Sequence, residues 1–103
     1  MVRYAVQIFR SSKEQKIVGY CNSLLDARKK AVRSLIKKDA RGWQAYIYNV
    51  EKPDRNWGVG LLWDPGYIND QVMEKPSVAL KKGAVFVIYD GYKAREIDLN
   101  GRL

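Results

Sequence analysis

The chain has 103 residues, a formal net charge of +8 and 47% apolar residues. This length fits one domain, so we expect a single domain over residues 1–103, and the apolar content argues against disorder. Histidine is absent and Cys21 is the only cysteine. These two facts exclude His-dependent catalytic triads, the usual Cys/His zinc sites and an intrachain disulfide.

The cysteine and the apolar runs also suggest a compartment. Cys21 ends the apolar stretch 17–21, where we expect a small buried side chain and not a reactive thiol. An unpaired cysteine without a disulfide framework is typical of a reducing compartment. The longest apolar run, residues 84–89, is far shorter than the roughly 20 residues of a transmembrane helix, and the amino terminus lacks a signal-peptide pattern. We therefore expect a cytoplasmic protein with no membrane partner.

The first predicted elements are two neighbouring strands. Side chains in residues 3–10 alternate between two faces, which is the period of a strand with a preferred face. The polar residues 11–15 predict a hairpin loop, and residues 16–21 resume a β-prone run. Strands of similar length on either side of a short polar segment favour antiparallel pairing.

A helix is predicted over residues 23–41. Ser23 is placed to cap its start, with Asp26 three residues later, and the aspartate suits the positive end of a helix. Gly42 indicates a stop after Arg41. At about 100° per residue, the apolar side chains gather within about half of the helix circumference. They are Leu24, Leu25, Ala27, Ala31, Val32, Leu35 and Ile36.

Two further strands are predicted over residues 43–50 and 57–63, joined by a turn at residues 52–56. In the second of these strands large apolar side chains alternate with glycines. Gly58 and Gly60 indicate a bulge or a close approach of the backbone.

Residues 64–82 predict a long connection, with a helical turn near residues 69–74 and a break at Pro76. Residues 84–89 and 92–99 then predict a hairpin, because Asp90-Gly91 between them is a type I′ turn signal.

The predicted order of elements is β-β-α-β-β-loop-β-β. It indicates an α+β fold, with a mostly antiparallel sheet of about six strands and one amphipathic helix packed across one face.

The residues that carry enzyme chemistry do not form a recognisable pattern. Ser34 precedes Lys37 and Lys38, but this spacing is expected by chance on a basic helix. Glu96 and Asp98 form the nearest acidic cluster, and we expect both to lie on a solvated strand face. A nucleotide-binding glycine loop is absent, because the glycines near residue 58 lack a third glycine and a following helix. We expect no enzyme activity, no catalytic residues, no metal site and no cofactor.

The excess positive charge lies in the first half of the chain. Residues 1–52 hold 12 Lys/Arg and 4 Asp/Glu, whereas residues 53–103 hold 7 of each. Five basic side chains on the predicted helix fall opposite its apolar stripe and form an exposed ridge roughly 18 Å long. Basic residues around the first hairpin loop extend this patch if they lie nearby. The candidate nucleic-acid-binding residues are therefore Lys29, Lys30, Arg33, Lys37, Arg41, Arg10, Lys13 and Lys16.

This basic surface has two interpretations. It can bind the phosphates of DNA or RNA, because neutralising phosphates releases counterions and supplies most non-specific affinity. Alternatively, it is a solvated face that keeps a small protein soluble. Arg28 differs, because it falls within the apolar arc. We expect its head to reach outward to solvent or, less simply, to pair with an acidic partner.

Aromatic residues support a second function. One helix cannot cover both faces of a six-stranded sheet, so some rings are expected at the surface, where they mark a protein partner or stack on bases. Core packing accounts for most of them more simply. This alternative is a protein-interaction module, a homo-oligomer, an adaptor or a small inhibitor of another protein, that uses an aromatic sheet face and the loop at residues 64–82. Its candidate interface residues are Trp57, Trp63 and Tyr67. Its partner is an acidic protein surface or a second copy. We favour a non-enzymatic nucleic-acid-binding module, because packing explains the segregation of charge less easily than it explains the aromatic content.

Overall fold

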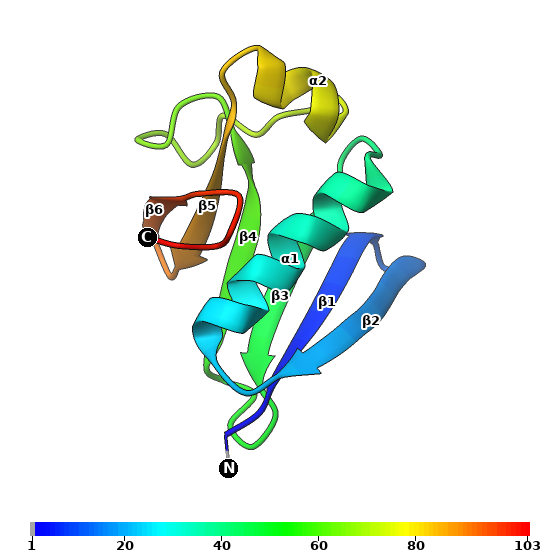
Figure 1. Cartoon of the computed structure of the whole chain (residues 1–103), viewed down its shortest axis with the longest axis vertical. Coiled ribbons are helices and arrows are strands. Elements are labelled where there is room, and N and C mark those ends of the chain that lie inside the picture. Colours follow the sequence, from blue (N-terminus) through cyan, green and yellow to red (C-terminus); the bar gives the residue numbers. More distant parts are fainter. Residues whose placement is uncertain (1) are drawn as a thin grey trace.

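A computed structural model describes residues 2–103, which form one sheet with helices on one side (Figure 1). The elements in chain order are β1 (Tyr4–Ser11), β2 (Glu14–Cys21), α1 (Leu24–Lys38), β3 (Gln44–Asn49), β4 (Asn56–Leu62), α2 (Pro76–Lys81), β5 (Val85–Asp90) and β6 (Lys93–Ile97). Within these residues six strands lie in the spatial order β2-β1-β3-β4-β5-β6, and every pair is antiparallel. The predicted α+β class, the six-stranded antiparallel sheet and the order of elements are confirmed.

Helix α1 starts where its sequence predicts. The hydroxyl of Ser23 accepts the backbone N–H of Asp26 at 3.1 Å, as in a capping box. The buried side chains of the helix recur at helical spacing on the face that packs against the sheet: Ala27, Ala31, Val32 and Leu35. Each of the larger ones contributes about 1.5–3 kcal/mol by leaving water.

The predicted end of this helix at Arg41 is wrong, because α1 ends at Lys38. Asp39 takes the left-handed conformation with φ of 45°, and its N–H donates to the carbonyl of Leu35 at 3.0 Å. Its carboxylate also accepts the backbone N–H and the hydroxyl of Ser77, at 2.8 and 2.9 Å. Aspartate tolerates this conformation better than most side chains, so it ends the helix before Gly42.

The core lies between α1 and the sheet. Side chains from alternate positions of the central strands meet the helix, as the register requires when Val6 opposes Ile47 and Val59 opposes Ile88. Phe86, 1% exposed, is the largest fully buried side chain. Because a one-residue slip would turn all these side chains to the other face, core burial fixes the register of the sheet.

Two hairpins differ from expectation. The loop between β1 and β2 is shorter than the predicted residues 11–15, because Ser11 already pairs with Glu14. The Ser11 hydroxyl accepts the N–H groups of Lys13 and Glu14, which stabilises this tight turn. In the last hairpin, Gly91 has φ of 63°, whereas Tyr92 is not among the residues of positive φ. This pattern belongs to a type II′ turn and not to the predicted type I′ turn.

The long connection after β4 contains α2, and the predicted helical turn at residues 69–74 is wrong. Pro76 begins α2 and does not break a helix, because its fixed φ and missing N–H suit the first turn. Ala79 packs with Val72 and Ala84 in a second apolar cluster, which also contacts Trp63.

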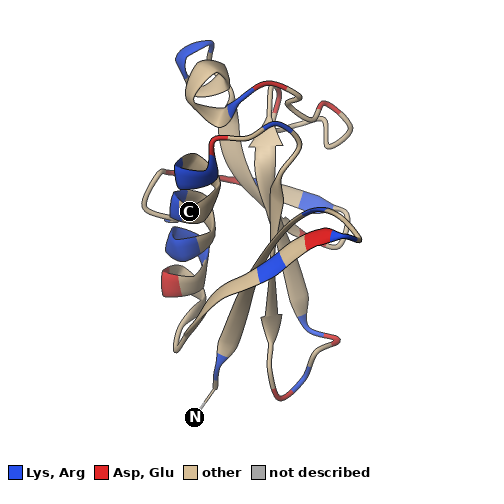
Figure 2. Cartoon of the chain, turned by 90° about the vertical axis from the view of Figure 1, so that its right-hand side faces the viewer, with Lys and Arg blue, Asp and Glu red and all other residues tan. Residues whose placement is uncertain are grey.

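One face of the sheet lacks a covering helix within residues 2–103, as Figure 2 shows in side view. Tyr46, Gly58 and Tyr89 are neighbours across three strands and lie on this face, opposite to the α1 face. A Cβ at Gly58 would lie 3.2 Å from Tyr89 Cδ2, so the glycine allows the tyrosine ring to lie close over the backbone. The prediction for β4 was a bulge or a close backbone approach, and the neighbour that lies close to Gly58 is instead the side chain of Tyr89.

Candidate functional site

A groove lies between α1 and β2. Strand β2 is the outermost strand on this side of the sheet (Figure 1). The groove has a volume of about 930 Å³. Ile8, Val18 and Cys21 supply apolar lining, and polar side chains of the helix and of β2 complete it. The groove therefore joins an apolar base to charged walls.

The charged lining is almost entirely positive. Six basic side chains line the groove, namely Lys16, Lys29, Lys30, Arg33, Lys37 and Lys38, and Asp26 is the one acidic side chain among its described lining residues. Figure 2 shows Lys and Arg recurring along α1. The ion pairs formed within residues 2–103 are Arg10–Glu14 and Lys82–Glu74, and neither involves a basic residue of the groove. The groove therefore carries an uncompensated positive field.

Lys30 connects the two walls of the groove. Its side chain crosses from α1 to β2 and lies against the backbone of Gly19, where a Cβ would overlap Lys30 Cε. The apolar stem of the lysine is thereby used in packing while its charge stays in the groove. A glycine at this point of β2 makes the crossing sterically possible.

The structure brings together five of the eight basic residues predicted to form the surface. Lys16, Lys29, Lys30, Arg33 and Lys37 all line the groove. Lys38 also lines it, although the sequence reasoning omitted this residue. Its position next to Lys37 in a basic segment could have indicated a place in the basic surface. The helical spacing, however, did not place Lys38 opposite the apolar stripe with the other five basic residues. Arg41 and Lys13 do not line the groove, since Arg41 follows the end of α1 and Lys13 lies in the β1–β2 turn.

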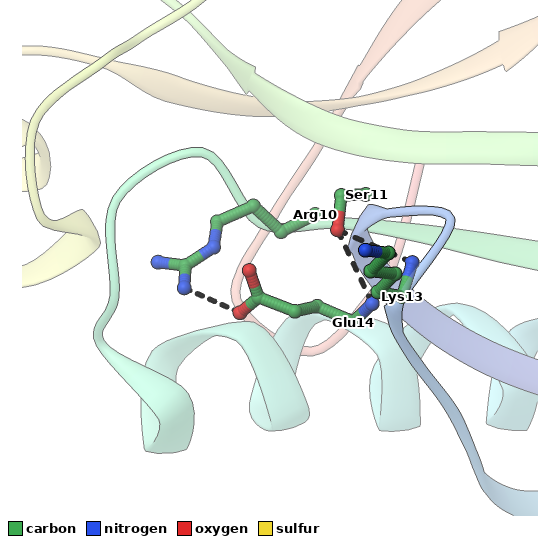
Figure 3. Close-up of polar contacts among 4 residues, drawn as sticks. All are labelled: Arg10, Ser11, Lys13 and Glu14. Carbon is green, nitrogen blue, oxygen red and sulfur yellow. Dashed lines mark hydrogen bonds and ion pairs between the residues drawn. The ribbon is translucent and has the colours of Figure 1, made fainter.

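Arg10 is directed elsewhere (Figure 3). Its guanidinium forms an ion pair with Glu14 and lies 5.5 Å from the ring centre of Trp43. Lys38 Nζ lies over the same ring at 4.6 Å. The prediction that Arg10 extends the basic helix surface is therefore replaced by a stack of two cations on Trp43, next to one end of the groove.

Cys21 is partly buried in the groove lining. Burial raises the pKa of its thiol, the charge of Lys30 lowers this pKa, and Asp26 raises it. A raised pKa keeps the thiol protonated at neutral pH and makes it a poor nucleophile. Its role in the groove is that of a small apolar side chain.

Arg28 is partly exposed, and it forms no ion pair with an acidic side chain of residues 2–103. Its Nε donates to the carbonyl of Gly101 at 2.7 Å. Asp98 stabilises the turn at residues 98–102, because its Oδ1 accepts the backbone N–H groups of Asn100 and Arg102 at 2.8 and 2.9 Å. These hydrogen bonds lower the pKa of Asp98, with the one from Arg102 contributing most.

The three candidate interface rings do not share one exposed surface. Trp57 packs against the main core and meets Tyr4 edge-on, with ring centres 6.0 Å apart. Trp63 packs against the second cluster, and Tyr67 is 59% exposed. The odd-numbered side chains of β4 face α1, so Trp57 is partly covered on that side, and Trp63, which follows β4, is also partly buried.

Tyrosines occupy the uncovered sheet face. Tyr46 and Tyr48 lie 5.5 Å apart between ring centres, and Tyr20, 51% exposed, has the Arg3 guanidinium 4.6 Å above its ring. The sequence predicted surplus rings at the surface but assigned them to Trp57, Trp63 and Tyr67, because it could not show which face of the sheet α1 covers.

Within residues 2–103, no three Asp, Glu or Cys side chains group as metal ligands, and no helix has the length and apolarity to cross a membrane. Comparison of the chain with protein families, with curated proteins and with solved structures found no match.

Proposed function

We propose that this protein is a non-enzymatic nucleic-acid-binding module, and that the groove between α1 and β2 is its binding surface. The observation that carries the proposal is the lining of the groove, six basic side chains against one acidic side chain. Lys and Arg side chains along a groove follow a phosphate backbone, and the counterions that they displace favour binding.

The arrangement of these charges also favours recognition of the backbone over recognition of a sequence. Four lysines and an arginine project from a single helix, and flexible lysines act as point charges for phosphates. The apolar base of the groove accepts sugar or base surface without selecting among bases. Binding is therefore expected to depend strongly on salt and weakly on sequence.

The like charges themselves support a binding role. Lys29, Arg33 and Lys37 follow one another at spacings of four residues on α1. Such pairs destabilise an isolated helix by a few tenths of a kcal/mol each. A polyanion in the groove would relieve this repulsion.

The test is a fluorescence-anisotropy titration of labelled oligonucleotides, single-stranded and duplex, over a range of salt concentrations. We expect a log–log salt slope of about −0.7 to −0.9 for each phosphate contact, and several contacts. Replacing Lys30, Arg33 and Lys37 with glutamate should abolish binding while the fold is kept.

A matched control separates the groove from net charge alone. Replacing Lys52, Arg55 and Lys93 with glutamate lowers the net charge by the same amount at exposed positions outside the groove. The control is expected to bind nearly as well as the wild type. Equal loss of binding in both triple variants would refute the groove as the site, and no binding of any oligonucleotide at low salt would refute the function.

A protein-interaction module is the second candidate. The tyrosines of the uncovered sheet face support it, because aromatic surface without a covering layer is typical of interfaces. Light scattering at high concentration tests the version in which a second copy covers this face: a dimer supports it, and a strict monomer removes it.

A further inference from the structure

One edge of the sheet is a free strand next to the helix layer. Strand β2 lies at the end of the strand order, and β1 is its one strand neighbour among residues 2–103. Beyond this pairing, residues 15–21 form no backbone hydrogen bond with another part of the described chain. The outer side of an edge strand carries a row of unpaired N–H and C=O groups. Such an edge is where an extended peptide can add a further strand to a sheet.

The free edge also forms one wall of the basic groove. Residues of β2 and of α1 line the groove from its two sides. Lys16 of β2 opposes Ile8 across the sheet, and Gly19 opposes Val6, because β2 has an extra residue at Val18. Both of these β1 partners belong to the core that α1 covers. The side chain of Lys16 and the open position at Gly19 are therefore on the side of β2 that faces the helix.

A lysine of α1 places its charge directly on this edge strand. The Lys30 side chain lies against Gly19, and its Nζ is 3.1 Å from the position that a Cβ would take at this glycine. The Cβ atoms of opposing residues on neighbouring strands are about 4.5–5.5 Å apart. An aspartate or glutamate of an added strand, placed opposite Gly19, would therefore have its carboxylate within reach of the Lys30 ammonium. Arg33 and Lys37 continue the positive charge along the same wall.

The other side of β2 offers an apolar contact. Tyr20 opposes Ala5, which in turn opposes Tyr48, so the ring of Tyr20 lies on the sheet face away from α1. Tyr20 is 51% exposed. Successive side chains of a strand point to opposite faces, so an added strand would place every second side chain next to Tyr20 and the others towards the basic wall. The segment that matches this edge therefore alternates acidic and apolar side chains.

Charge indicates which occupant fits the edge. A second copy would bring its own basic helix to the contact, because antiparallel pairing of two β2 strands sets the two helices side by side on one face. Lysines on an edge strand oppose such self-pairing. An acidic segment instead neutralises the groove, in which six basic side chains and one acidic side chain line the described walls. The free edge and the charge together favour an extended acidic partner.

We infer that the outer edge of β2 binds an extended acidic segment of a partner protein as a seventh strand, with acidic side chains towards α1 and apolar side chains on the other face. The segment lies in the groove and competes there with nucleic acid, and this competition rests on the proposed function. The partner protein thereby regulates nucleic-acid binding. Backbone pairing distinguishes the two ligands, since a nucleic acid has no peptide groups to pair with β2.

The probe for the test is a peptide of alternating glutamate and valine, about as long as β2 and blocked at both ends. It is titrated into ¹⁵N-labelled protein. The amide signals of residues 15–21 should shift, and their outer N–H groups should exchange with solvent more slowly because they become hydrogen-bonded. The signals of β6, at the opposite edge of the sheet, are the internal control and should stay in place. Binding should weaken as salt rises, because the contacts with the groove are ionic.

Two methylated peptides test the backbone pairing at constant charge. Methylating the backbone nitrogen of every glutamate, or of every valine, removes the N–H donors from opposite edges of the peptide strand. One of the two peptides should bind about tenfold more weakly than the unmethylated probe or worse, and the other should keep most of the affinity. Equal affinities of the two methylated peptides would refute the added strand and assign the binding to charge alone.

Two protein variants separate the peptide from the nucleic acid. Tyr20→Ser removes the apolar contact on the face away from the groove. It should weaken peptide binding about two- to fivefold and leave oligonucleotide binding unchanged. Tyr92→Ser is the matched control, because Tyr92 is 95% exposed in the turn between β5 and β6. This control should change neither affinity, and equal peptide affinities of the two variants would remove Tyr20 from the site.

The outcomes keep this inference and the proposed function apart. Oligonucleotide binding by a protein whose β2 signals do not respond to the peptide would refute the added strand and leave the proposed function standing. Peptide binding at β2 by a protein that binds no oligonucleotide would keep the added strand and refute both the proposed function and its regulation. Simultaneous binding of both ligands would refute the competition. The expected result is that the alternating peptide displaces a bound oligonucleotide, whereas the methylated peptide that loses affinity does not.

Discussion

Arg28 of α1 donates from Nε to the backbone carbonyl of Gly101 at 2.7 Å, across 73 residues of chain. Burial and, to a lesser degree, the charge of Arg95 lower the pKa of Arg28. The guanidinium nevertheless stays charged, because arginine is not deprotonated in proteins. Gly101 is buried with φ of 78°, and a Cβ there would lie 2.5 Å from the backbone nitrogen of Lys29. The hydrogen bond therefore holds the end of the described chain against the first turns of α1.

Replacing Arg28 with methionine is expected to destabilise the protein by about 1–2 kcal/mol, because the Gly101 carbonyl loses a charged donor in a partly buried place. Chemical denaturation measures the change. Arg33→Met, an exposed change on the same helix, should stay within about 0.5 kcal/mol of the wild type. Equal stability of the two variants would show that the contact contributes nothing.

Replacing Lys30 with methionine is expected to leave the thermal midpoint nearly unchanged and to weaken nucleic-acid binding. Methionine keeps an apolar stem against Gly19 but removes the charge from the groove. The log–log salt slope of binding should become shallower by about 0.7–0.9, the loss of one phosphate contact. An unchanged slope would place Lys30 outside the contact surface.

The carboxylate of Asp39 should make the stability of the protein depend on pH. The N–H and then the hydroxyl of Ser77 lower the pKa of its carboxyl in the folded state. A depressed folded pKa gives stability that is present above the unfolded value of about 3.9 and is lost as the pH falls through the lower folded value. Asp39→Asn tolerates the same backbone conformation and should be less stable than the wild type at neutral pH.

The difference between Asp39→Asn and the wild type should shrink as the pH falls below about 4. Denaturant titrations at successive pH values measure it, with Asp54→Asn as an exposed control. A difference that persists at the lowest pH would assign the effect to something other than the ionised carboxylate.

Replacing Gly58 and Gly60 with alanine should change the stability of the protein differently. A Cβ at Gly58 would meet Tyr89 at 3.2 Å, whereas a Cβ at Gly60 would have ordinary contacts at 3.8 Å. Alanine in a strand gains about 0.5–1 kcal/mol over glycine from reduced freedom of the unfolded chain. Gly60→Ala should therefore be neutral or stabilising, and Gly58→Ala should be about 1 kcal/mol less stable than Gly60→Ala in chemical denaturation. Equal effects would show that Tyr89 yields freely.

Local patterns predicted most of the elements, and tertiary contacts changed their ends. The alternation in residues 3–10 and the capping pair Ser23 and Asp26 depend on near neighbours, so they could be interpreted correctly. The end of α1 could not be predicted from near neighbours, because Asp39 is held by Ser77, 38 residues away. The start of α2 at Pro76 was missed because a proline is compatible both with a break in a helix and with the first turn of one.

The sequence by itself determined the charge, the exclusion of histidine and cysteine chemistry, and the helix whose basic side chains recur every four residues. The tertiary structure decided where those charges lie. The packing of α1 beside β2 turned a ridge into a groove, added Lys38 and left out Arg10, Lys13 and Arg41. The tertiary structure also left β2 as a free edge beside α1, because the order of strands in a sheet depends on long-range backbone pairing that periodicity along the chain does not encode.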